Sequence, residues 1–399
     1  MTLEDDLRTT LARAATRAPA APPGLLDGVA RRRRRRTRSR LLASAAAVVL
    51  VATGTVLAVR HERPEPVVIT PSLPAITEDQ VAGSPPVEEV WPGAVQVAPA
   101  SLENGRRLRP LLIADDHTTL LTTWNSHERA GAVYAYDQRT RELRQVTLVP
   151  SRKGEIADGF VVAGDELVWH VKSDTSATLW RAPLAGGRAE RLPGTLPHVP
   201  WAPELVGDRL VYTAGDTGVF SVPVTGGPPT PVPGGEGLHV LEWPWAGDPF
   251  LPSEGEKEVR FRRLVNLETG EVRHAALTPG DRYVVCGVTT CSGQHADGTS
   301  FARARDGSGE RAVPFTPQGL AADRFTAVTV TGRDEVEQYV VDVVTGRSGS
   351  LELNVALDGG ERSYTTMGPT VHDRDMLSVH RTGDDTLVFI DLRRITSGP

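Results

Sequence analysis

The sequence has few of the residue types that build catalytic and metal-binding centres. Of its 399 residues only two are cysteine, and its ten histidines include no His-Glu-x-x-His arrangement. It also contains no Gly-x-Ser-x-Gly nucleophile elbow and no EF-hand calcium loop. We therefore expect no enzyme activity, no bound metal and no cofactor, and we assign no catalytic residue.

Charge of both signs is present but unevenly distributed. Residues 1–40 contain eleven arginines and four acidic residues, a charge of +7, which leaves −13 for the remainder of a chain whose net charge is −6. The densest basic run consists of Arg31, Arg32, Arg33, Arg34, Arg35, Arg36, Arg38 and Arg40. We expect no nucleic-acid partner, because no aromatic platform surrounds this run and the remainder of the chain is acidic.

The arginine run leads directly into residues 41–59, which carry no charge. As a helix this segment would extend about 28 Å, close to the roughly 30 Å hydrocarbon core of a bilayer. Arginine on one flank predicts that this flank is cytoplasmic, so the protein is expected in the cell membrane as a single-pass protein with most of the chain outside. A cleaved signal peptide is the alternative, since Val56-Leu57-Ala58 resembles a cleavage site, although signal segments are usually shorter.

The segments on either side of the apolar run differ in character. Residues 1–40 form a basic cytoplasmic stub, in which Leu3, Leu7 and Leu11 predict a short helix with a narrow apolar stripe. Residues 60–86 contain six prolines. We expect this second segment to form neither helix nor sheet and to act as a semi-rigid spacer.

A strand–turn–strand unit recurs through the rest of the chain. Its turns lie about 40 residues apart, at Arg139–Glu142 and around Gly186, Gly226, Gly270, Ser308 and Gly346. Each turn is rich in glycine or polar residues and lies between β-prone runs, which is typical of a hairpin. Short strands with this period predict an all-β fold, a β-propeller, over residues 87–399.

The two ends of the repeat region complement one another. Thr386–Asp391 matches the strand that precedes the first turn, but too few residues follow it to supply an outer strand. Val87–Val97 is a strand candidate that precedes the first unit. Pairing the two segments would close a ring of seven blades and protect both edges. A ring of six remains the alternative, if one weak unit is an insertion.

The glycine-containing hairpins, such as Leu-Ala-Gly-Gly-Arg around Gly186 and Val-Val-Thr-Gly-Arg around Gly346, resemble a known group. They are similar to the TolB/YncE-type and WD40-like propellers of bacterial envelope proteins, over about residues 87–399. The resemblance concerns the fold pattern, because the Trp-Asp ends of WD40 repeats are absent. It implies a propeller outside the cytoplasm, in a layout that many single-pass envelope proteins share.

Cys286 and Cys291 are separated by only four residues. In the oxidising compartment that the topology predicts, an even number of cysteines favours a disulfide. Such a bond would close a small hairpin and stabilise it by roughly 2 kcal/mol in the loop-entropy picture. A pair of free buried thiols is the alternative.

Three tryptophans lie close to prolines: Trp201, Trp243 and Trp245. The prolines predict that these residues lie in loops rather than strands. Exposed aromatic residues on rigid loops are common binding anchors, so we take the three tryptophans as candidate ligand-binding residues. The alternative is that they fold back and fill gaps between blades.

Three functions are compatible with this organisation. The first is a membrane-anchored binding or scaffold protein whose propeller meets an envelope protein or glycan. The second is a transmembrane regulator, similar in layout to anti-sigma factors, that contacts a cytosolic partner through residues 1–40. The third is an envelope hydrolase that uses acids such as Asp115, Asp116, Asp373 or Asp375, although acids also occupy ordinary turns.

Overall fold

The computed structural model describes residues 73–126, 129–173, 176–248, 259–315, 319–331, 335–351, 355–356, 375–381 and 386–395. Most of the regular structure in these residues is β-strand. No helix among them is long and apolar enough to cross a bilayer. The predicted membrane helix at 41–59 and the short helix of the stub lie outside the described residues, so both stay predictions.

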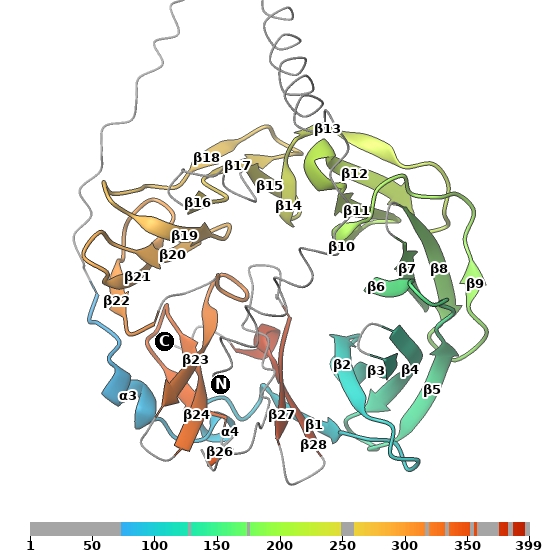
Figure 1. Ribbon diagram of the computed structural model, residues 1–399, viewed down its shortest axis with the longest axis horizontal. Coiled ribbons are helices and arrows are strands. Elements are labelled where there is room, and N and C mark those ends of the chain that lie inside the picture. Colours follow the sequence, from blue (N-terminus) through green and yellow to red (C-terminus); the bar gives the residue numbers. More distant parts are fainter. Residues whose placement is uncertain are drawn as a thin grey trace, which may run out of the picture. The chain divides into compact units, whose positions relative to one another are not determined.

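The described residues form seven β-sheets, which we number as blades 1 to 7 (Figure 1). Blade 1 contains β2 (Leu108–Ile113), β3 (Thr118–Ser126), β4 (Arg129–Asp137) and β5 (Leu143–Leu148). Blade 2 contains β6 (Ile156–Ala163), β7 (Glu166–Lys172), β8 (Ala177–Pro183) and β9 (Glu190–Arg191). Blade 3 contains β10 (Trp201–Val206), β11 (Arg209–Thr213), β12 (Gly218–Pro223) and β13 (Thr230–Glu236). Blade 4 contains β14 (His239–Glu242), β15 (Trp245–Asp248), β17 (Arg263–Asn266) and β18 (Val272–His274).

The remaining three blades are less regular. Blade 5 contains β19 (Arg282–Cys286), β20 (Thr290–Gln294), β21 (Ser300–Ala304), β22 (Arg311–Val313) and the parallel strand β16 (Val259–Arg260). Blade 6 contains β23 (Phe325–Thr331), β24 (Glu335–Asp342), β25 (Ser348–Ser350) and β26 (Val355–Ala356). Blade 7 combines β27 (Met376–Arg381) and β28 (Thr386–Asp391) with β1 (Val95–Pro99) from the other end of the propeller. Two short 3₁₀ helices complete the set, η1 (Gly215–Thr217) and η2 (Leu392–Arg394).

The apolar core is divided into seven clusters, each shared by two consecutive blades. Fully buried Trp169 of blade 2, for example, packs in a cluster with Leu120 and Val133 of blade 1. Phe389 of blade 7 shares a cluster with Leu121 of blade 1, which brings the last blade against the first. The ring therefore closes with seven blades, and the six-blade alternative is wrong.

Ring closure occurs through the strand pair that the sequence predicts. Strand β1 pairs antiparallel with β28, and Val97 lies opposite Val388. The candidate segment 87–97 is only partly strand, however. Val87–Val90 forms the short helix α4, and the paired strand begins at Val95.

The expected spacer extends too far along the chain. Residues 75–84 contain no proline, and helix α3 (Glu78–Ala82) forms there, with Thr77 and Gln80 as a reciprocal capping box. Ile76 and Val81 are buried among residues of blades 5 and 6, and the Leu73 N–H donates to Glu310 O at 3.1 Å. Residues from Leu73 onward thus pack against the propeller, ahead of the predicted start at 87.

Candidate functional site

Three of the strands that begin blades carry a β-bulge that contains a residue with positive φ. The antiparallel pairing shifts between Asp158 and Val161 in β6, between Trp201 and Glu204 in β10, and between Arg282 and Val285 in β19. Each shift contains one residue with positive φ: Gly159 (61°), Ala202 (46°) and Tyr283 (53°). Positive φ is uncommon for alanine and for a bulky residue such as tyrosine. Bulges of this kind re-aim side chains and are frequent next to functional sites.

The three bulges lie at the same end of the propeller. Asp158 is opposite His170, Trp201 opposite Thr213 and Arg282 opposite Gln294, so each bulge lies near the end of the second strand of its blade. We call this end, where second and third strands connect, the loop face. The opposite end, where hairpins join first to second and third to fourth strands, is the turn face.

The bulged strands expose a small group of mixed side chains, which we call the bulge set: Asp158, Trp201, Arg282 and Tyr283. Trp201 is 53% exposed and Tyr283 46%, which places them among the most exposed large apolar residues in the described part of the chain. Asp158 Oδ2 accepts a hydrogen bond from Lys172 Nζ at 2.8 Å, and Arg282 is exposed. The set thus combines two aromatic faces with one acidic and one basic group. β6 and β10 contact one another and lie on the inner side of their sheets (Figure 1).

The three candidate tryptophans have different environments. Trp243 is half-buried in the turn between β14 and β15, at the turn face, where its backbone N–H donates to Glu204 Oε2 at 3.0 Å. Its indole Nε1 donates to Glu268 Oε1 at 2.9 Å. Trp245 is buried, and the Arg273 guanidinium lies 4.2 Å from the centre of its ring. The structure therefore does not gather the three tryptophans into one site, and only Trp201 presents a largely exposed ring.

The prediction that all three tryptophans lie in loops is wrong for two of them. Trp201 is the first residue of β10, and Trp245 is the first residue of β15. Proline is tolerated close to these positions because β10 is an edge strand of its sheet, where one side of the backbone needs no ladder partner. Pro244 lies in the turn that precedes β15 rather than within the strand.

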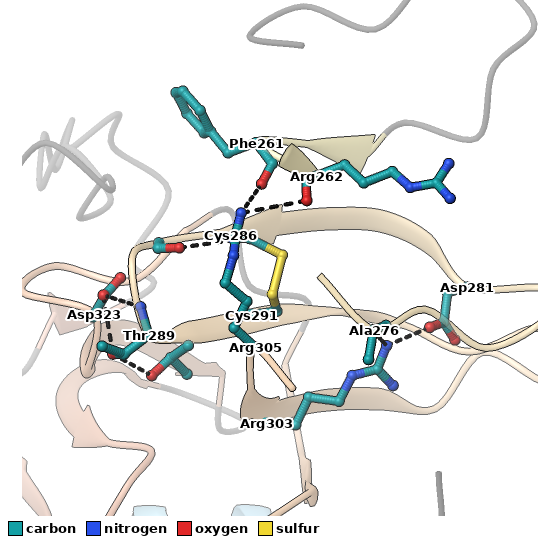
Figure 2. The surroundings of a disulfide bond; sticks show 12 residues. Phe261, Arg262, Ala276, Asp281, Cys286, Thr289, Cys291, Arg303, Arg305 and Asp323 are labelled. Carbon is teal, nitrogen blue, oxygen red and sulfur yellow. Dashed lines mark hydrogen bonds and ion pairs between the residues drawn. A yellow bond between two sulfur atoms is a disulfide. The ribbon is translucent and has the colours of Figure 1, made fainter. Parts of the chain in front are cut away.

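The disulfide between Cys286 and Cys291 is confirmed. The two residues face one another across β19 and β20, with their Cα atoms 4.0 Å apart, and both are fully buried (Figure 2). They lie in the cluster between blades 4 and 5 with Trp245 and Phe301. The bond thus crosslinks the two strands of the first hairpin of blade 5, close to the bulge at Tyr283.

Blade 5 also contains a buried ionic cluster. The Arg303 side chain is fully buried, and its guanidinium donates to Asp281 at 2.6 Å, Glu310 at 2.8 Å and Ala276 O at 2.8 Å (Figure 2 shows the first and third of these bonds). His295 bridges the same two carboxylates, through Nδ1 at 2.9 Å and Nε2 at 3.3 Å. Burial raises the pKa of Asp281, but hydrogen bonds from Thr278, Arg303 and His295 outweigh it and lower the pKa overall. The carboxylates are thus paired with a buried guanidinium and with His295, and we interpret the cluster as structural.

A second buried cation and a half-buried acid lie near the turn face of blade 5. Arg305 donates to Gly287 O at 3.0 Å and to Phe261 O, and burial lowers the pKa of this guanidinium to about 10 (Figure 2). Asp323 accepts from the Thr289 N–H at 2.7 Å, and burial raises the pKa of its carboxyl despite that bond. Both groups hold turns of neighbouring blades together. The described residues contain no group of three or more His, Cys, Asp or Glu side chains arranged to hold a metal.

The sequence predicts only one member of the bulge set as a binding residue. Trp201 was a candidate, whereas Asp158, Arg282 and Tyr283 were not. Gly159 inside a strand pattern is a recognised signal for a bulge. Ala202 and Tyr283 carry no such signal, because neither residue type favours positive φ.

Comparison with known proteins identifies no relative by sequence: no family model and no curated protein matches the chain. Similar folds occur among solved structures. YCF48 bound to D1 peptide is 10% identical, with 77% of this chain and 99% of that chain covered and a TM-score of 0.43. BamB from Moraxella catarrhalis is 12% identical, with 81% and 100% covered and a TM-score of 0.35. A prolyl endopeptidase is 11% identical, with 70% and 46% covered and a TM-score of 0.41. These likenesses concern the fold and assign no activity.

Proposed function

We propose that this protein is a membrane-anchored, extracytoplasmic β-propeller that binds an envelope protein through the bulge set on its loop face. The observation that carries the proposal is the presence of three such bulges at one end of the ring, which expose Trp201 on blade 3 and Arg282 and Tyr283 on blade 5. Tryptophan, tyrosine and arginine are the residue types most enriched among the energetically dominant contacts of protein interfaces. This composition favours a protein partner over a glycan.

The anchored topology is supported by the sequence alone. Arginines Arg31–Arg36 precede the uncharged run at 41–59, and the propeller follows it. The topology is tested by adding protease to intact cells and to lysed cells. We expect the propeller to be cleaved in intact cells while an epitope at the N-terminus stays protected. Protection of both ends in intact cells would contradict the proposed orientation.

Partner binding is tested by crosslinking and capture from intact cells, with the full-length chain as bait. We expect the double variant Trp201→Ala, Tyr283→Ala to recover the specific partner at least about tenfold less than the unchanged protein, since such anchors each contribute about 2 kcal/mol or more. The control is Val344→Ala, which removes a similarly exposed apolar side chain (48% exposed) from the turn between β24 and β25 of blade 6.

Other outcomes of the same capture distinguish the alternatives. Recovery of a cytosolic protein that depends on residues 1–40 would favour the transmembrane regulator. Equal recovery of the partner by the unchanged protein and the double variant would reject the bulge set as the binding site. Turnover of an envelope glycan or peptide by the full-length protein would contradict the proposed non-enzymatic role.

A further inference from the structure

A small cavity lies between blades 2 and 3, next to two of the bulges. Its walls are mainly apolar and are formed by Leu179, Leu196, Pro200, Pro203, Leu210 and Val222. Gly159, His170 and Tyr212 complete the lining. The space accommodates about one water molecule and nothing larger.

Two of the lining residues each carry a buried polar atom with no hydrogen-bond partner among the described protein atoms: His170 Nε2 and Tyr212 Oη. Both side chains are almost completely buried, with His170 2% and Tyr212 1% exposed. Buried polar atoms in native proteins nearly always have a partner, either protein or ordered water. The two atoms come from different blades, His170 from β7 and Tyr212 from β11.

Both side chains are uncharged near neutral pH. Burial lowers the pKa of the His170 imidazole to about 4, and burial raises the pKa of the Tyr212 phenol to about 12. A neutral imidazole and a neutral phenol provide no charge that would hold an ion. Their polar atoms also make the cavity unsuitable for an apolar guest.

We infer that the cavity binds one water molecule that hydrogen-bonds both His170 Nε2 and Tyr212 Oη and so bridges blades 2 and 3. A water molecule can donate or accept at either atom, so it fits both neutral tautomers of His170. The size of the cavity excludes larger polar ligands. The water site belongs to the packing beneath the bulges of β6 and β10, whether or not the bulge set binds a partner.

The bridge lies where the two bulged strands approach each other. A Cβ added at Gly159 would lie 2.7 Å from ring atoms of His170 and 2.5 Å from Pro203 Cγ. Pro203 follows Trp201 by two residues on β10. The water site therefore supports the contact that positions Asp158 and Trp201 on the loop face.

The first test is the sign of the stability change in Tyr212→Phe, measured by thermal unfolding of the detergent-solubilised full-length chain. If water bridges the two atoms, loss of the hydroxyl breaks one hydrogen bond of the water molecule. His170 Nε2 is then left with a water molecule that is held less firmly. We expect the unfolding midpoint to fall by about 1–3 °C. If the hydroxyl is unsatisfied, its removal relieves a buried polar group, and an unchanged or higher midpoint would overturn the inference.

A matched control separates this effect from loss of a hydroxyl in general. Tyr134→Phe also removes a phenolic hydroxyl, but that group lies at the surface, 3.4 Å from Gln145 Oε1. We expect its midpoint to stay within about 0.5 °C of the unchanged protein. A fall as large as that of Tyr212→Phe would contradict a specific role for the cavity.

The second test is a high-resolution crystal structure of the full-length protein. We expect one density peak within hydrogen-bond distance of both His170 Nε2 and Tyr212 Oη, and its loss or weakening in Tyr212→Phe. We also expect the penalty of Tyr212→Phe to shrink in a His170→Leu background, since the water has then already lost a partner. A direct bond between the two side chains, or an empty cavity, would refute the bridge.

Discussion

At the scale of single residues, the most demanding arrangement is the enclosure of Arg303 by two carboxylates. Its guanidinium also lies 4.1 Å from the centre of the Phe301 ring, so an aromatic face and two carboxylates surround the cation. Removal of one charged group from a buried ion pair leaves its partner as an uncompensated buried charge. Loss of a single member of the cluster should therefore destabilise blade 5 strongly.

We expect Arg303→Met to destabilise the protein by about 3–5 kcal/mol, because Asp281 and Glu310 would then be buried without their cation. The measurement is the free energy of unfolding from urea titration. The control is Arg282→Met, which removes an exposed arginine of the same blade and should cost less than about 1 kcal/mol. Similar losses in both variants would show that burial of the Arg303 cluster has no special role.

His170 predicts a dependence of stability on pH. Its pKa falls from 6.5 in the unfolded chain to about 4 in the folded protein, chiefly through burial, with Asp158 acting against and Lys172 adding to that shift. On acidification the unfolded chain takes up the proton first, so the contribution is complete above about pH 6.5 and is lost as the pH falls towards 4. The loss amounts to roughly 3 kcal/mol.

The measurement is urea unfolding at a series of pH values for the unchanged protein and for His170→Gln, whose amide stays neutral throughout. We expect the variant to show a flatter profile between pH 6.5 and 4. Parallel profiles would mean that His170 is not held neutral in the folded protein.

At the scale of elements, the hairpins were predictable because their signals are local. Five of the six predicted turns join the third and fourth antiparallel strands of blades 1 to 5, and the sixth joins β24 and β25 of blade 6. In three of them one side chain accepts backbone N–H bonds from residues two and three positions later: Asp137, Asn266 and Asp342. Such Asx turns depend on residues that are adjacent in the chain. The bulges of β10 and β19 depend on neighbouring strands, so the sequence contained no signal for them.

The bulge in β6 can be tested with a pair of glycines from one blade. Gly159 and Gly164 both have positive φ, 61° and 65°, so alanine is strained at either position. Only at Gly159 would the new Cβ collide with His170 and Pro203, since nothing lies within 4 Å of the position at Gly164. We expect Gly159→Ala to lose about 1–3 kcal/mol more stability than Gly164→Ala.

Thermal or urea unfolding of both variants provides the comparison. Because the collision would push β10 away from β6, Gly159→Ala should also weaken partner capture through Trp201, whereas Gly164→Ala should not. Equal losses of stability would show that the packing between the two blades can relax at this point.

At the scale of the whole molecule, the number of blades and the way the ring closes followed from the repeat and from its incomplete last unit. The exposure of the candidate tryptophans did not follow, because it is set by residues distant in the chain. Arg273 covers Trp245, and Glu204 and Glu268 hold Trp243. The segment containing α3 was also missed, since its burial depends on blades 5 and 6 rather than on its own composition.

Ring closure depends on β28. It is the central strand of blade 7, and Val388 lies opposite Val379 of β27 and Val97 of β1. Proline at this position removes a backbone donor inside a sheet and disturbs a residue that is only 1% exposed. Since blade 7 joins the two ends of the ring, the damage should reach the clusters shared with blades 6 and 1.

We expect Val388→Pro to lower the free energy of unfolding by at least about 3 kcal/mol, through lost strand pairing and packing, and to broaden the urea transition as both ends of the ring open. The control is Val272→Pro, at the first residue of the outer strand β18, where Val272 is 46% exposed and proline is tolerated.

Hydrogen exchange should show the loss of protection centred on β1, β27 and β28 and spreading into blades 6 and 1. A loss confined to β28 would mean that the neighbouring blades hold together without closure, and that the ring is stabilised blade by blade.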